Sequence, residues 1–197
     1  MIIEYTHLNN EINYDGSQIN PFWALKEHNI KGSSIISWIG SMNIMPDNLK
    51  DFEDVGLEIK SDKMIHFICE FFDTQPANME IAYLRQRLLV LIFKEKLLEK
   101  GIIADRSGDD LFVENKKLSV SIATASISSM KIHFGINLTS KGTPIDIETI
   151  GLFELVNNSK IRIFQENNIV SFINSFISDY IDELKSIKLD IAKSDIS

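Results

Sequence analysis

Three strand-like runs separated by short turns dominate the middle of the chain. They are LFVE (111–114), KLSVSIATA (117–125) and MKIHFGINLT (130–139), and the segments ENKK (114–117) and SISS (126–129) join them. Consecutive strands with links this short pair antiparallel, because a parallel return needs a crossover of a dozen or more residues. The sequence therefore predicts an antiparallel meander.

Helical patterns and further strand patterns surround the meander. Asn20 followed by Pro21 is typical of a helix start, and residues 78–100 carry apolar residues at helical spacing before Gly101. Adjacent strands with few helices favour an α+β fold, with a mostly antiparallel sheet and helices packed on one face. We expect one domain over residues 1–197. Its further elements are strands at 2–6, 33–41 and 64–73, and a C-terminal helical extension over about 166–197.

Composition limits the classes of protein that remain. The chain has 197 residues and is 44% hydrophobic, enough for one core, and its net charge of -8 disfavours nucleic acid or a membrane surface as a general partner. Cys69 is the single cysteine and the longest apolar run, 88–93, is too short to span a bilayer, so a cytoplasmic protein is expected. The four histidines are scattered, and no metal site is expected.

The alternation of side chains predicts two different faces for the meander. Leu118, Val120 and Ile122 would share an apolar face with every second residue of the next strand. These residues are Ile132, Phe134, Ile136 and Leu138. The opposite face would carry small or polar residues, and helices would cover the apolar face. A floor of small residues can support a flat or long ligand, although an ordinary solvated sheet face gives a similar pattern. The small or polar set is Lys117, Ser119, Ser121, Ala123, Ala125, Lys131, His133, Gly135, Asn137 and Thr139.

The strand expected at 64–73 places His66 and Glu70 on one face. These two could form a polar pair on the ligand side, and a purely structural pair explains the pattern equally well. Cys69 lies among aromatic residues and is expected to be a buried, unreactive thiol.

The stretch GDDLFVENKKLSVSIATASISSMKIHFGINLTSKGTP (108–144) resembles the catalytic core of the biotin and lipoate protein ligases. Asp109-Asp110-Leu111 stands where that family has Asn-Asp and an apolar residue, and Lys117-Leu118-Ser119 stands where it has its lysine motif. HFGIN (133–137) is similar to the Gly-Ile-Asn strand of the biotin ligases. QINPFWALKEH (18–28) and SSIISWIGS (33–41) resemble the family's first helix and the strand after it.

The resemblance implies a ligase-type fold and a carboxylic acid, or its adenylate, as the ligand. In that family the motif lysine reaches the carboxylate and phosphate of an acyl-adenylate, so Lys117 would stabilise developing negative charge while Asp110 points into the site. ATP and Mg²⁺ are the implied cofactors, with Asp109 and Asp110 as candidate Mg²⁺ ligands, and an acceptor protein is an implied partner. The residues implied to bind the substrate are Ser119, Ser121, His133, Gly135, Asn137, His66 and Trp38.

The whole chain also resembles an uncharacterised, mainly archaeal family of about this length that shares the ligase fold. Between Ser41 and Phe71, however, there is neither the Arg-Arg-x-x-Gly-Gly segment of lipoate ligases nor the Gly-Arg-rich loop of biotin ligases. Three functions therefore stay open: a ligase or acyltransferase, a non-catalytic module that binds a small molecule or a protein, and a tRNA-related role that the net charge disfavours. The apolar C-terminal helix also leaves a homodimer open.

Overall fold

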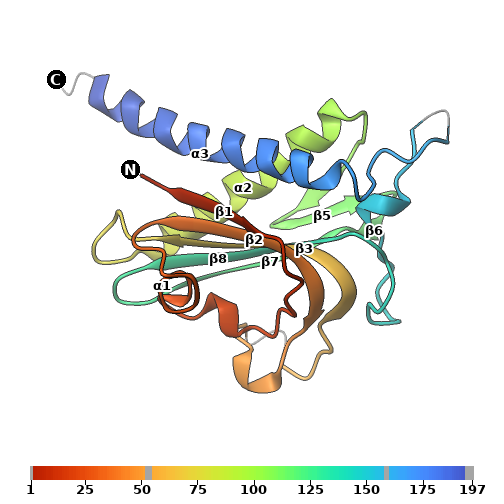
Figure 1. The fold of residues 1–197 in the computed structure, drawn as a ribbon, viewed down its shortest axis with the longest axis horizontal. Helices are drawn as coiled ribbons and strands as arrows, with labels where there is room; N and C mark the ends of the chain where they lie inside the picture. Colours follow the sequence, from red (N-terminus) through yellow and green to blue (C-terminus); the bar gives the residue numbers. More distant parts are fainter. Residues whose placement is uncertain (1, 52–54, 158–159, 194–197) are drawn as a thin grey trace.

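The computed structural model of the protein describes residues 2–51, 55–157 and 160–193 (Figure 1). Its main sheet has five strands in the order β1-β2-β3-β8-β7. β1 runs parallel to β2, and the other neighbouring pairs run antiparallel. The strands are β1 (Glu4–Leu8), β2 (Ser34–Asn43), β3 (Lys60–Phe71), β7 (Ser119–Ala125) and β8 (Met130–Asn137).

A second, three-stranded sheet changes the expected meander. It contains β4 (Asp105–Ser107), β5 (Asp110–Val113) and β6 (Lys116–Lys117). The first of the three expected runs therefore does not join the main sheet, and the prediction of one continuous meander was wrong. The chain passes between the sheets at Leu118, whose N–H bonds Leu111 O (2.8 Å) while its own carbonyl accepts from Asn137 N (2.9 Å).

Two long helices cover one face of the main sheet (Figure 1). α2 (Met79–Glu99) begins at Asn78, whose side chain accepts a hydrogen bond from Ile81 N, and α3 (Ile169–Lys193) forms the C-terminal extension. The rings of Phe93 in α2 and Phe176 in α3 meet edge to face, with centroids 5.0 Å apart, above the sheet. This helix-covered face is the larger core, and alternate residues of β3 and β8 fill it.

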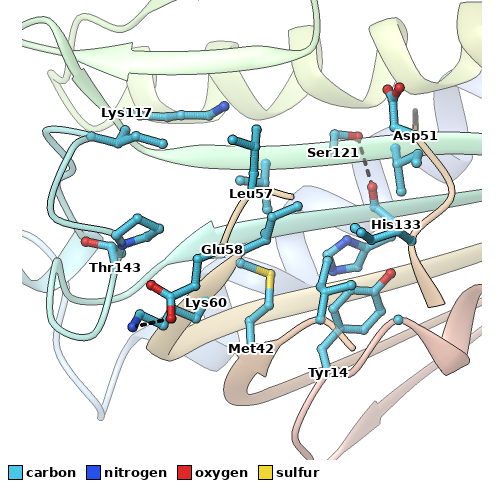
Figure 2. Close-up of a pocket in the computed structure, with 18 of the residues that line it drawn as sticks. Tyr14, Met42, Asp51, Leu57, Glu58, Lys60, Lys117, Ser121, His133 and Thr143 are labelled. Atoms are coloured by element: carbon cyan, nitrogen blue, oxygen red, sulfur yellow. Dashed lines mark hydrogen bonds and ion pairs between the residues drawn. The ribbon is translucent and has the colours of Figure 1, made fainter. Parts of the chain in front are cut away.

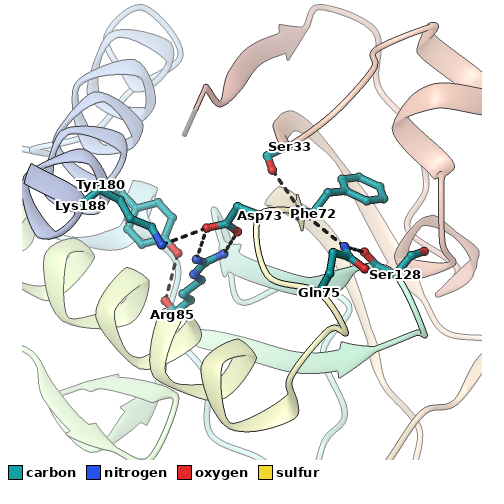
Figure 3. A network of polar contacts seen from close by, with 8 residues as sticks. All are labelled: Ser33, Phe72, Asp73, Gln75, Arg85, Ser128, Tyr180 and Lys188. Atoms are coloured by element: carbon teal, nitrogen blue, oxygen red, sulfur yellow. Dashed lines mark hydrogen bonds and ion pairs between the residues drawn. The ribbon is translucent and has the colours of Figure 1, made fainter. Parts of the chain in front are cut away.

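A buried ion pair connects the two long helices to Asp73, which follows the end of β3 (Figure 3). The Arg85 guanidinium donates to both carboxylate oxygens of Asp73, at 2.7 and 2.8 Å, and the Lys188 ammonium of α3 lies 3.5 Å from the same carboxylate. The Tyr180 hydroxyl donates to the Arg85 carbonyl at 3.2 Å. Charges from both helices therefore meet at one carboxylate.

The opposite face of the main sheet packs against the N-terminal part of the chain. α1 (Trp23–His28) and the short 3-10 helix η1 (Ser17–Ile19) lie on that side. Ile19 and Ala24 belong to a second, smaller core together with Trp38 of β2 and Met64 of β3. This cover leaves the β7 end of the face open, and the candidate site lies there. Two further 3-10 helices are η2 (Pro46–Asn48) and η4 (Leu152–Glu154).

Candidate functional site

A cavity of about 400 Å³ opens on the face of the sheet opposite α2 and α3 (Figure 2). Its floor comes from β7 and β8, and its walls come from the described parts of the β2–β3 connection and from residues 143–149. This volume lies within the range of small-molecule sites in proteins.

One end of the cavity carries an ion pair between Lys117 and Asp110. The Lys117 ammonium lies 2.7 Å from an Asp110 carboxylate oxygen, and the two side chains are 25% and 30% exposed. The backbone holds Lys117 on both sides, since its N–H donates to Glu148 O (2.8 Å) and its carbonyl accepts from Ile150 N (3.0 Å). Both charges can therefore be reached from the cavity while their backbone is fixed.

Asp109, next to this pair, is held by helix α2. Arg87 donates to one carboxylate oxygen at 2.6 Å and the Gln86 amide donates to the other at 2.8 Å. The same Gln86 amide donates to Ser121 Oγ (2.9 Å), which in turn donates to the His133 carbonyl (2.9 Å). Burial raises the pKa of Asp109, and the Arg87 charge opposes that change. The network links α2 to the floor of the cavity.

The other end of the cavity rests on stacked rings. Tyr14 lies flat on His133, with centroids 3.7 Å apart and planes 10° apart, and His133 Nε2 is 3.1 Å from Nδ1 of His66 beneath it. Burial lowers the pKa of His66 to about 4, although the backbone at Gly40 and Ser41 acts in the opposite direction. Burial also lowers the pKa of His133 well below its usual value. Both imidazoles are therefore neutral near pH 7.

Comparisons with known proteins give the family. Residues 3–195 match a family described as a domain of unknown function, DUF366. The chain belongs to the DUF366 family. An uncharacterised protein of Methanocaldococcus jannaschii is 38% identical over 189 residues, which cover 93% of this chain and 80% of that protein. The structure of a protein of unknown function from Pyrococcus horikoshi matches all of both chains, with a TM-score of 0.87 and 33% identity.

More distant structures show the fold. The biotin protein ligase of Aquifex aeolicus, in complex with biotin and ATP, matches with a TM-score of 0.59 and 16% identity over 93% of this chain and 72% of that chain. The expected α+β fold of the biotin and lipoate ligase catalytic domains is confirmed, as is the resemblance to an uncharacterised archaeal family. Among the described residues of this DUF366 chain, no helix is long and apolar enough to cross a membrane.

The structure brings five of the expected site residues together around the cavity. Lys117, Asp110, Ser121, His133 and Asn137 all line it. The side-chain amide of Asn137 donates a hydrogen bond to the Lys117 carbonyl at 3.5 Å. Whether they bind a substrate stays a prediction.

Four other expected residues lie away from the cavity surface. His66 and Trp38 are fully buried beneath Tyr14, and the Trp38 indole donates to Ile12 O at 2.8 Å. Gly135 makes room for Met64 and Val120, because an added Cβ would lie 3.0 and 3.2 Å from their side chains. Ser119 is fully buried and its hydroxyl accepts from Leu111 N at 2.9 Å.

The expected faces are right for β8 and inverted for β7. In β8, Phe134 faces the helices and His133 faces the cavity, as expected. In β7, Val120 and Ile122 face the cavity, whereas Ser119, Ser121 and Ala123 lie level with Phe134 and its neighbours on the helix side. Ser121 nevertheless reaches the cavity edge. The expected alternation runs without a break through Leu118, but the chain changes sheets there, so the side chains of β7 face the opposite way.

The expected pairing of His66 with Glu70 is also wrong. Four residues along a strand span roughly 13 Å, which is beyond side-chain hydrogen bonding. His66 pairs with His133, and Glu70 accepts from Phe22 N (2.9 Å) and from Ser129 Oγ (2.7 Å).

Sequence reasoning missed several residues that shape the cavity. Tyr14 lies in the segment between β1 and η1, and Met42, Leu57 and Thr143 lie at strand ends or in loops. No periodic pattern marks them, because their place depends on how the loops fold over the sheet.

Proposed function

We propose that the protein binds a small carboxylic acid in this cavity and activates it as an adenylate. The observation that carries the proposal is Lys117, whose side chain is 25% exposed at one end of the cavity, next to apolar residues of β7. A fixed cation in a cavity that excludes water stabilises the charge of a carboxylate or acyl-phosphate more strongly than water does. Biotin and ATP in the Aquifex aeolicus ligase, which has the same fold, support this reading.

The residues near Lys117 are compatible with a magnesium nucleotide. Mg²⁺ in such sites takes one or two carboxylates and completes its shell with phosphate oxygens and water. Asp109 lies next to Asp110 at the cavity surface and would supply a carboxylate. Asp110 would keep the Lys117 ammonium oriented toward the cavity.

The test is pyrophosphate release from ATP and Mg²⁺ in the presence of single acids, including biotin, lipoate and octanoate. We expect release with one class of acid, reduced by a factor of about 100 or more in Lys117→Ala. Lys116→Ala is the matched control, since Lys116 is the neighbouring lysine of β6 and does not line the cavity. Equal losses in both variants would contradict the role of Lys117.

A specific observation favours a second candidate, a binding module without catalysis. Each of the three lysines among the described residues that line the cavity already has a polar partner: Lys117 has Asp110, Lys60 has Glu58 (2.8 Å), and Lys50 has Asn20 (3.1 Å). The β2–β3 connection, residues 44–59, contains no arginine and a single glycine, Gly56. A ligand that raises the melting temperature without any pyrophosphate release would support this candidate.

A further inference from the structure

We propose that the acid bound in this cavity is a zwitterion, with an ammonium group beside its carboxylate and an apolar side chain. The proposal rests on the proposed function, which places the carboxylate at Lys117. It narrows the ligand to amino acids and compounds with the same pair of adjacent charges.

The first step concerns what a carboxylate meets at Lys117. The Asp110 carboxylate is already 2.7 Å from the Lys117 ammonium. A plain carboxylic acid that approaches Lys117 therefore brings a second negative charge next to Asp110, and like charges at such a distance repel. A ligand with a neighbouring ammonium group presents that group to Asp110 and its carboxylate to Lys117. Each protein charge then keeps an opposite charge beside it.

The second step concerns the charge around the cavity as a whole. Among the described residues that line it, five carboxylates stand against three lysines, and Arg87, which pairs with Asp109, reduces the excess of negative charge to one. The histidine in the lining, His133, is buried and adds no positive charge near pH 7. Walls with an excess of negative charge attract cationic groups and disfavour a ligand whose only charge is negative. The same balance favours an ammonium group on the ligand.

The third step concerns the rest of the ligand. Beyond the ion pair, the lining includes the paired Lys60 and Glu58 and the apolar residues Met42 and Leu57 (Figure 2). Val120 and Ile122 of β7 add further aliphatic side chains. Apolar surface of this kind binds an apolar group by removing it from water. A bulky aliphatic or aromatic side chain fits this part of the cavity.

The experiment compares ligands that differ by one charge. Isothermal titration of the full chain would use L-phenylalanine, 3-phenylpropanoate, which lacks the ammonium group, and 2-phenylethylamine, which lacks the carboxylate. L-2-aminooctanoate and octanoate form an aliphatic pair. We expect each zwitterion to bind about tenfold or more tightly than its single-charge counterparts, because a hydrogen-bonded charge pair is gained in each case.

Two aspartate variants connect the preference to Asp110. In Asp110→Asn, zwitterion binding should weaken and binding of the plain acids should strengthen, so that the preference disappears. Asp105→Asn is the control, since Asp105 is exposed in β4 and does not line the cavity. Thermal unfolding of each variant verifies that it is folded.

The outcomes separate this inference from the proposed function. If the plain acids bind the wild-type protein more tightly than the zwitterions, the inference of a zwitterionic ligand is wrong, while the proposed binding of an acid is still supported. An unchanged preference in Asp110→Asn would overturn the zwitterion's contact with Asp110 and the inference with it. If none of the carboxylates binds, the proposed function and this inference both fail.

Discussion

Ion pairs lie on both sides of the main sheet, but they are buried to different degrees. On the helix-covered face, Arg85 and Asp73 are 2.7 Å apart and only 9% and 14% exposed. On the cavity face, Lys117 and Asp110 are also 2.7 Å apart, yet they are 25% and 30% exposed. Distance alone therefore does not distinguish a pair that fastens helices from one that a ligand can reach. Burial does.

The floor of the cavity adds a third arrangement. His66 and His133 form a pair of neutral rings, fully buried under Tyr14. A charged pair at this depth would cost more free energy to desolvate than a neutral pair, which keeps its hydrogen bond without that cost. The cavity face thus places neutral polar groups at its base and charges near its opening.

Breaking the buried ion pair should have the largest effect on stability. Arg85→Met leaves the Asp73 carboxylate buried with Lys188 3.5 Å away, and we expect a loss of about 3–4 kcal/mol in the free energy of unfolding. Arg87→Met is the control, because Arg87 pairs with Asp109 at a site where the two side chains are 35% and 27% exposed. Its expected cost is about 1 kcal/mol or less. Urea unfolding of both variants measures the difference, and equal costs would show that burial does not separate the two pairs.

Acid should weaken the cavity face before it weakens the Arg85–Asp73 pair. Burial lowers the pKa of His66 to about 4 in the folded state, whereas the unfolded chain titrates near 6.5. The unfolded state therefore binds more protons between these values. The contribution of His66 to stability is complete above pH 6.5 and falls toward pH 4 by roughly 2–3 kcal/mol. His133, whose pKa burial also lowers, changes stability in the same direction. Burial raises the pKa of Asp73, but Arg85 outweighs that and brings it below the usual value, so the ion pair persists over this range.

The measurement is the free energy of unfolding at a series of pH values from 7 to 4. His66→Gln should make the curve shallower, since it removes one of the two buried imidazoles whose pKa is lowered on folding, while His133 remains. A wild-type curve that is flat over this range would mean that the rings accept protons in the folded protein as readily as in the unfolded one.

Local patterns in the sequence were sufficient for most of the fold and for one strand of the site. Asn78 and Gly101 mark the helix α2 within one or two residues, and the alternation in β8 puts His133 and Asn137 on the cavity side as observed. These signals are local, because caps and strand alternation act over a few residues. The motif around Lys117 also led to the correct fold family.

The remainder depended on contacts between distant parts of the chain. The row of small residues in β7 indicated a ligand floor, but Ala123 is small because it packs in the core under α2. The reversal at Leu118 follows from two backbone hydrogen bonds: Leu118 N–H donates to Leu111 O, and Asn137 N–H donates to Leu118 O. No local sequence pattern predicts these bonds. Tyr14 reaches His133 across more than a hundred residues of sequence. Such placements depend on tertiary contacts, which the strand propensities of single residues do not predict.

The smallest expected effect tests this assignment of the faces of β7 directly. Ala123→Leu and Ile122→Phe each add three carbon atoms, at neighbouring positions that face opposite sides of the sheet. Ala123 is 4% exposed against the helices, so the added atoms overpack the core and should cost about 1–2 kcal/mol. Ile122 lines the cavity, where the added atoms find room and should cost less than about 1 kcal/mol while they reduce the space for a ligand. Urea unfolding of the two variants would reveal the order, and the reverse order would restore the small-residue face of β7 as the floor of the site.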